Sequence, residues 1–241
     1  MPVSTGPVST GPAAALLLLA DGRMPTGSHA HSGGLEAAVQ AGRVRDAGDL
    51  AAWLAGRLAT VGRVDAAFAA VAWAAAGTDF GITRKRWGVL DAELSARVAP
   101  PAWRAASRAQ GRGLVRAAHR CWPSAPLDAL AAALPAGAPW PLALGVAGRA
   151  AGLGAGDVTL AAGAAAVQGP AWAATRLLGL DPYAVAACLA GLAPAIDREA
   201  AAARRWADPG VDARLLPAAS APWLDIGAAD HGTWEVRLFA S

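Results

Sequence analysis

The chain has 241 residues, 55% of them hydrophobic, and its 21 basic and 18 acidic residues leave a formal net charge of +3. The basic residues are scattered arginines rather than a block, which argues against a dedicated nucleic-acid-binding protein. Only two cysteines occur, Cys121 and Cys188, and their wide separation excludes a disulfide framework and a cysteine zinc site. Alanine dominates the apolar residues, so we expect an all-α fold, and two ordinary thiols favour a cytoplasmic protein.

The N-terminus begins with a tandem copy of Pro-Val-Ser-Thr-Gly in residues 2–11. Such a segment has little to bury, and we expect residues 1–12 to form a disordered leader before a single helical domain over 13–241. A first helix is expected over 13–20. No lysine or arginine precedes its apolar run, which therefore lacks the basic start of a secretory signal.

The segment from Met24 to Glu36 contains one proline, three glycines, two serines and two histidines. These residues set the shape of the backbone and expose hydrogen-bonding groups, which is typical of a recognition surface rather than of a core. Ser32 is placed to act as the N-cap of a second helix, which Gly42 ends.

Two residues of this segment, His29 and His31, carry imidazoles, which nickel accepts as ligands. Two imidazoles alone bind a metal weakly, so we expect no stably bound cofactor, and transient contact with nickel stays open. The alternative is a helical, metal-dependent enzyme that uses His29, His31 and Glu36. No phosphate loop or nucleophile elbow accompanies them, because the glycines of 152–156 lack a preceding strand and a following lysine. Four histidines and four glutamates in the whole chain also leave few candidates for general acid–base catalysis.

Further helices are expected where apolar residues recur at helical spacing and a glycine or proline follows. In the first half of the chain, one helix starts at Asp46 or Asp49 and is ended by Gly62, and further helices cover 65–76, 79–98 and 103–122. In the second half, after a proline-rich stretch at 123–141, they cover 142–152, 158–178, 182–192 and 194–206. No segment alternates apolar and polar residues like a strand, so the expected fold is a single bundle of about 8–10 helices.

The helix expected over 103–122 carries an arginine at every fourth position, which makes a slowly turning basic stripe. The five residues are Arg104, Arg108, Arg112, Arg116 and Arg120. A solvated face is the commonest explanation of such a stripe, and a docking surface for an acidic protein comes second. Nucleic acid comes third, because no aromatic residues interleave on that face for stacking.

Two windows, 129–148 and 158–175, are free of charged residues and about as long as a membrane-spanning helix. The first contains three prolines and the second is mostly alanine and glycine, which contribute little to transfer into a membrane. We therefore expect no membrane association.

The C-terminal segment, about 217–241, is expected to be an extended tail. It ends in Arg237, Leu238, Phe239 and Ser241, which combine a planar guanidinium, two apolar anchors and a terminal carboxylate. Such an end is typical of a segment that folds on binding a partner, although Leu238 and Phe239 could instead pack into their own domain.

Three elements together resemble the family of urease accessory protein F (UreF). They are Pro-x-Gly-x-x-x-His-Ser-x-Gly-Leu-Glu at 25–36, Ser-Arg-x-Gln-Gly at 107–111 and the last five residues, Arg237–Ser241. Trp140-Pro141 and Thr175-Arg176-Leu177 add support. The resemblance extends from about Leu16 to Ser241, and it departs from the family pattern at Thr26 and His29.

The resemblance implies an all-α, often homodimeric chaperone of the cytoplasm that performs no catalysis. It would assemble with UreD (also called UreH) and the GTPase UreG to deliver nickel into apo-urease, modulating GTP hydrolysis by UreG, with nickel handled by the complex. It also implies a set of partner-binding residues: Pro25, Gly27, His31, Ser32, Gly34, Leu35, Glu36, Arg108, Gln110, Gly111, Arg237, Leu238, Phe239 and Ser241.

Overall fold

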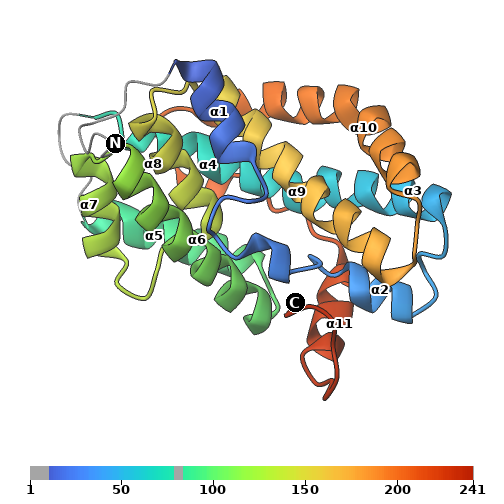
Figure 1. The fold of residues 1–241 in the computed structure, drawn as a ribbon. Coiled ribbons are helices and arrows are strands. Elements are labelled where there is room, and N and C mark those ends of the chain that lie inside the picture. The colour runs from blue at the N-terminus through green and yellow to red at the C-terminus, as the bar shows by residue number, and fades with distance from the viewer. Residues whose placement is uncertain (1–10, 79–83, 241) are drawn as a thin grey trace, which may run out of the picture.

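The computed structural model describes residues 11–78 and 84–240, and the first ten residues of the expected leader lie outside these ranges. The described residues form helices and contain no strand, which confirms the all-α prediction (Figure 1). The helices are α1 (Pro12–Ala20), α2 (Leu35–Gln40), α3 (Ala47–Arg57), α4 (Arg63–Ala75), α5 (Arg84–Arg97), α6 (Pro101–Cys121), α7 (Ala125–Ala133), α8 (Trp140–Ala150), α9 (Ala155–Leu177), α10 (Pro182–Ala203) and α11 (Pro222–His231).

Helix α4 lies at the centre of the bundle and packs against α8 and α9. Most of its side chains are buried, and Phe68 and Val71 are at 0% exposure. The contact with α8 is very close, because a side-chain carbon on Gly145 would collide with the backbone of Ala69. A second apolar cluster lies between α3, α9 and α10, so the bundle has two adjoining cores.

Helices α3 and α4 form one continuous helix, Ala47–Ala75, joined by a π-helical turn at Leu58–Gly62. The predicted end at Gly62 is therefore wrong. Gly62 has ordinary helical angles, φ −59° and ψ −41°. Because glycine has no side chain, the side chains of Leu58 and Ala166 can pack closely against this position. Gly42, by contrast, has φ +67° just after α2, which confirms the predicted end of that helix.

The joined helix Ala47–Ala75 is long and apolar enough to cross a membrane by length and composition. However, 67% of its most apolar window is buried among the other helices, as in the core helix of a soluble protein. The windows 129–148 and 158–175 do not meet the same criterion.

Two other predicted helix boundaries, both placed at prolines, are also wrong. Residues 182–206 form one helix, α10, followed by a short 3₁₀ turn, rather than two helices separated at Leu192–Pro194. Pro194 lies on the exposed side, where the carbonyl that it leaves unpaired can face water. The proline-rich stretch 123–141 contains α7, because Pro126 occupies the first turn, where a missing N–H costs nothing.

The segment 217–241 is not wholly extended, because it contains α11 at Pro222–His231. This helix projects from one end of the bundle, and the chain then turns back toward α2 (Figure 1). A proline at the first helical position starts α11, and Ala228 and His231 bury one side of it. The projection places the last residues beside the N-terminal segment.

Candidate functional site

The N-terminal segment forms a loop over residues 21–34 that leads into α2. Gly33 and Gly34 have positive φ angles of +62° and +92°, and a side-chain carbon at Gly34 would lie 2.9 Å from the ring of Trp103. The loop thus needs glycine both for its turn and for its close approach to α6. The helix begins at Leu35, later than predicted, while the Ser32 hydroxyl accepts the N–H of Glu36 at 3.2 Å.

The predicted residues of this loop divide by burial. Pro25 and His29 are exposed, and Gly27 and His31 are half-buried. Ser32, Gly34, Leu35 and Glu36 are buried within the chain itself, with Ser32 and Leu35 at 0% exposure. The buried residues therefore stabilise the conformation of the loop and do not form its exposed surface.

Glu36 is the centre of a buried hydrogen-bond cluster that joins the two ends of the chain. Its carboxylate oxygens accept the N–H of Leu238 at 2.7 Å and of Phe239 at 3.0 Å, and Oε2 lies 2.9 Å from Nε2 of His231. Glu36 and His231 are only 8% and 4% exposed. Burial raises the pKa of Glu36, but the hydrogen bonds from His231, Leu238 and Phe239 outweigh it and hold the pKa below 4.5. The carboxylate is therefore charged at neutral pH.

The last described residues separate into one buried anchor and an exposed edge. Phe239 is 5% exposed, joins the apolar cluster of α3, α9 and α10, and has the guanidinium of Arg176 5.0 Å from its ring centre. Leu238 is 48% exposed and Arg237 is exposed. Phe239 thus packs into its own domain, whereas its neighbours face solvent; Ser241 lies outside the described residues.

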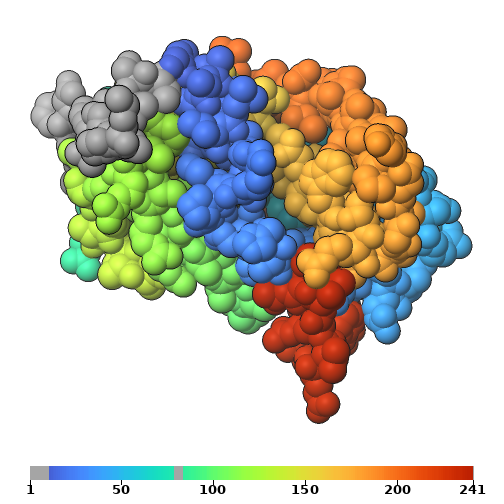
Figure 2. All heavy atoms as spheres, in the orientation of Figure 1, coloured from blue at the N-terminus to red at the C-terminus, as the bar shows by residue number. Residues whose placement is uncertain are grey.

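Helix α11 and the tail expose several large apolar side chains that no pattern in the sequence predicted. We define the C-terminal patch as the exposed large apolar side chains of α11 and the tail: Trp223, Ile226, Val236 and Leu238. Helix α11 and the residues after it form the projection at the end of the bundle (Figure 2). Exposed apolar groups gathered on one projection are typical of an interaction site. Helix α11 carries apolar residues all round, so spacing along it could not reveal an outer face.

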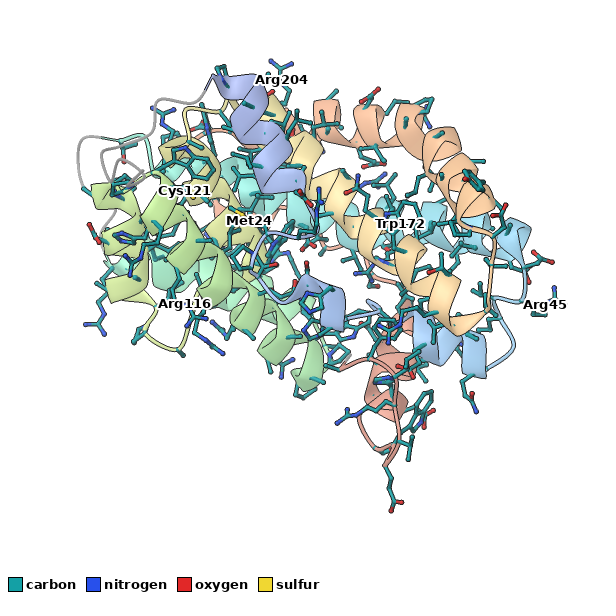
Figure 3. All side chains as sticks on the ribbon, viewed as in Figure 1. Met24, Arg45, Arg116, Cys121, Trp172 and Arg204 are labelled. Carbon is teal, nitrogen blue, oxygen red and sulfur yellow. The ribbon has the colours of Figure 1, made fainter. Side chains whose placement is uncertain are left out.

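The metal site of the alternative hypothesis, His29, His31 and Glu36, is not assembled. No group of three or more histidine, cysteine, aspartate or glutamate side chains in the described ranges is placed to hold a metal ion. Glu36 already accepts bonds from His231 and the tail, so it does not join His29 and His31. Both histidines instead line a groove beside α9, which also holds Trp172, labelled in Figure 3. Burial, together with neighbouring His29, lowers the pKa of His31.

The arginine stripe on α6 is divided by its contacts. Arg104 donates to the carbonyls of Val98 and Ala99, and Arg112 donates to that of Ala136. Arg108 pairs with Asp91 at 2.8 Å and donates to the Gly137 carbonyl at 3.0 Å. The first three arginines therefore hold neighbouring segments, and Arg116 and Arg120 remain exposed, with Arg116 directed away from the bundle (Figure 3).

The element Ser107–Gly111 is held by contacts within the chain. The Ser107 hydroxyl accepts the N–H of Trp140 at 3.0 Å, and a side chain on Gly111 would collide with the Ala138 carbonyl. Gln110 lines a half-open cavity. The partner-binding role of Arg108, Gln110 and Gly111 stays a prediction.

That cavity, about 150 Å³, lies between the loop, the joined helix and α6. Arg57 and Asp65 are eight positions apart, but the π turn between them accommodates one extra residue. They therefore lie on the same face of the joined helix, as residues i and i+7 do in a regular α-helix, and both side chains line the cavity. Arg57 donates to the carbonyls of Gly33 and Ala166 at 2.7 and 2.8 Å. Burial lowers the pKa of Arg57 to about 10 and raises that of Asp65 to about 7, although Arg57 opposes the second shift.

Replacement of Asp65 by asparagine is expected to change the pH dependence of stability. Asp65 titrates near 3.8 when unfolded and near 7 when folded, so its favourable contribution is complete below pH 3.8 and is lost as the pH rises through 7. The free energy of unfolding of Asp65→Asn, relative to that of the parent protein, should therefore rise by about 1–2 kcal/mol from pH 5 to pH 8. Water in the cavity screens the charge of Asp65 and keeps this difference small. Urea denaturation at both pH values measures this, with exposed Asp197→Asn as control. An equal difference at both pH values would contradict it.

Comparison with known proteins gives consistent results. The sequence model of the UreF family matches residues 44–193. A urease accessory protein UreF of Mycolicibacterium vanbaalenii is 44% identical over 232 residues, which cover 95% of this chain and 98% of that protein. The UreF protein of Mycobacterium sp. strain JLS is 43% identical over 226 residues, which cover 94% of this chain and 97% of that protein. The UreF protein of Mycobacterium marinum is 41% identical over 228 residues, which cover 95% of this chain and 98% of that protein.

Proposed function

The chain belongs to the UreF family of urease accessory proteins, and from this premise we propose that it is the docking scaffold of a nickel-delivery complex. Its relatives are named urease accessory proteins, which supports a role in urease maturation as a chaperone rather than an enzyme. In the proposal it joins UreD (UreH) and the GTPase UreG, modulates GTP hydrolysis by UreG, and delivers nickel into apo-urease. The complex acts in the cytoplasm, with this chain as a homodimer.

The observation that carries the proposal is the arrangement of the C-terminal end. Phe239 and the backbone of the tail are held from inside by the bundle, while Arg237 and Leu238 are exposed, as are Trp223 and Ile226 on α11. In the described ranges Arg237 has no ion-pair partner, so its guanidinium is open to a carboxylate of another protein. We assign UreD to this surface, because the resemblance to the UreF family implies that the tail docks on UreD.

Nickel is the cargo of the assembly rather than a resident cofactor. In this chain His29 and His31 are the residues proposed to contact the ion in passing, because both line the groove beside the tail. The exposed arginines of α6, Arg116 and Arg120, offer an acidic partner a second contact surface.

Complementation tests the proposed function. In cells that carry the urease subunits, UreD and UreG but lack this chain, we expect urease that is nearly free of nickel and activity close to background. Expression of the chain should raise both activity and nickel content of urease at least tenfold. The purified chain alone should hydrolyse no urea, which separates maturation from catalysis. Unchanged nickel content of urease on expression would contradict the proposal.

A further inference from the structure

We propose that Arg57 is a positioning residue that fixes the N-terminal loop from beneath, so that His29 and His31 stay together on the groove beside α9. The inference rests on the proposed function, in which these two imidazoles contact nickel in passing. Arg57 itself binds backbone and is not a ligand of the ion.

The side chain of Arg57 connects the joined helix to the loop and to α9. Its Nη1 donates to the carbonyl of Gly33, two residues after His31, at 2.7 Å, and its Nε donates to the carbonyl of Ala166 at 2.8 Å. Both acceptors belong to the backbone, so these bonds hold the path of the chain itself. The planar guanidinium supplies both donors in a fixed orientation, which the single ammonium of lysine does not reproduce.

Pro170 makes the carbonyl of Ala166 available to Arg57. Within a helix this carbonyl would accept the N–H four residues later, and a proline has none. Arg57 replaces the missing donor, so a buried proline is tolerated inside α9. A side-chain carbon on Gly33 would lie 3.0 Å both from Cγ of Pro170 and from Nη2 of Arg57. These three residues therefore form one close contact between the loop, α9 and the joined helix.

Two tryptophans and burial keep the guanidinium of Arg57 in this contact. The ring centres of Trp103 and Trp53 lie 5.6 and 5.9 Å from its central carbon. With a pKa of about 10, the buried guanidinium is still charged at neutral pH. Its hydrogen bonds to the two carbonyls are therefore charge-assisted and stronger than those between neutral groups.

The position of His31 connects this contact to the ion. His31 lines both the cavity that Arg57 faces and the groove that holds His29. Because Arg57 binds the chain two residues after His31, it restricts where the imidazole can lie. A loop fixed in advance presents both imidazoles to a passing ion without first having to be ordered.

Arg57→Lys keeps the positive charge and removes the paired donors. In the free chain the amides of Ala30 and His31, which are hydrogen-bonded within the loop, should exchange at least tenfold faster. Ni²⁺ alone, titrated onto the free chain, should broaden the NMR signals of the His29 and His31 rings only at about fivefold higher concentration. In the complementation assay the nickel content of urease should fall severalfold. Arg63→Lys, on an exposed position of the joined helix, is the matched control and should change none of these.

Pro170→Ala tests the same contact without changing Arg57. Alanine restores an N–H that competes with Arg57 for the carbonyl of Ala166, and it removes the ring that packs near Gly33. The loop amides should exchange faster and the histidine rings should respond to Ni²⁺ less readily. The stability of the helical domain should stay near that of the parent, because the regained helical hydrogen bond offsets the lost ring. Pro194→Ala, at an exposed proline inside α10, is the matched control and should leave the loop unchanged.

The outcomes separate the positioning role from general destabilisation and from the proposed function. If the loop amides exchange equally in Pro170→Ala, in Pro194→Ala and in the parent, Arg57 does not fix the loop. If Arg57→Lys frees these amides but the histidine rings respond to Ni²⁺ as in the parent, or urease keeps its nickel content, the positioning role is overturned and the proposed function stands. If the parent chain itself fails to raise the nickel content of urease, the proposed function fails and the positioning role fails with it.

Discussion

Deletion of Arg237–Ser241 is expected to abolish co-elution with UreD while the helical domain stays folded. The deletion removes the exposed Arg237 and Leu238, which the proposal assigns to the partner, and the two N–H groups that Glu36 binds. Loss of the buried Phe239 ring should cost about 2 kcal/mol of stability, which a bundle with two apolar cores can bear. The affinity for UreD should fall at least a hundredfold.

Size-exclusion chromatography with UreD, together with a thermal melt followed by circular dichroism, measures both parts of this expectation. Deletion of residues 2–10 at the opposite end is the control and should leave co-elution intact. Co-elution of the C-terminally shortened chain with UreD at the level of the full chain would count against the tail as the docking segment.

Gly145→Val is expected to cause a large loss of stability. A side chain at Gly145 on α8 would collide with the Ala69 carbonyl on α4, and would lie 2.7 Å from Cβ of Ala72 and 2.8 Å from the Trp73 nitrogen. Rigid backbone cannot yield as a flexible side chain does, so the two central helices must move apart. We expect a loss of about 3 kcal/mol or more in the free energy of unfolding.

Gly191→Val on α10 is the matched control for this substitution. Its added side chain meets nothing within 4 Å, and valine is a somewhat better helix former than glycine, so stability should change little or rise slightly. Urea denaturation compares the two variants. If they are equally stable, α4 and α8 are not in the close contact described.

The helical fold followed from the sequence because its evidence is local. Apolar spacing placed the bodies of α3 to α6 and of α8 to α10, and Gly42 marked the end of α2. The errors arose where a neighbouring helix decides the outcome. Gly62 does not end a helix, but lets the side chains of Leu58 and Ala166 pack closely against the backbone. Pro194 is tolerated within α10 because it lies on the side of the helix that faces water.

The candidate site was predictable in its location but not in the roles of its residues. The composition of 25–36 and the last residues marked both ends of the chain as functional. Nothing in local spacing shows that Glu36 meets His231 and Phe239, which lie 195 and 203 positions away. Likewise, the spacing of the α6 arginines indicates one face, but not that three of them reach the carbonyls of neighbouring segments.

Hydrogen exchange of the full chain, measured alone and bound to UreD, tests the central claim that this protein works through its C-terminal surface. The account predicts that UreD binding slows exchange in peptides covering Pro222–Ala240 and the loop at 27–36, with little change in the core helix α4. Slower exchange confined to α10 or to the exposed arginine face of α6, with Pro222–Ala240 unchanged, would contradict it.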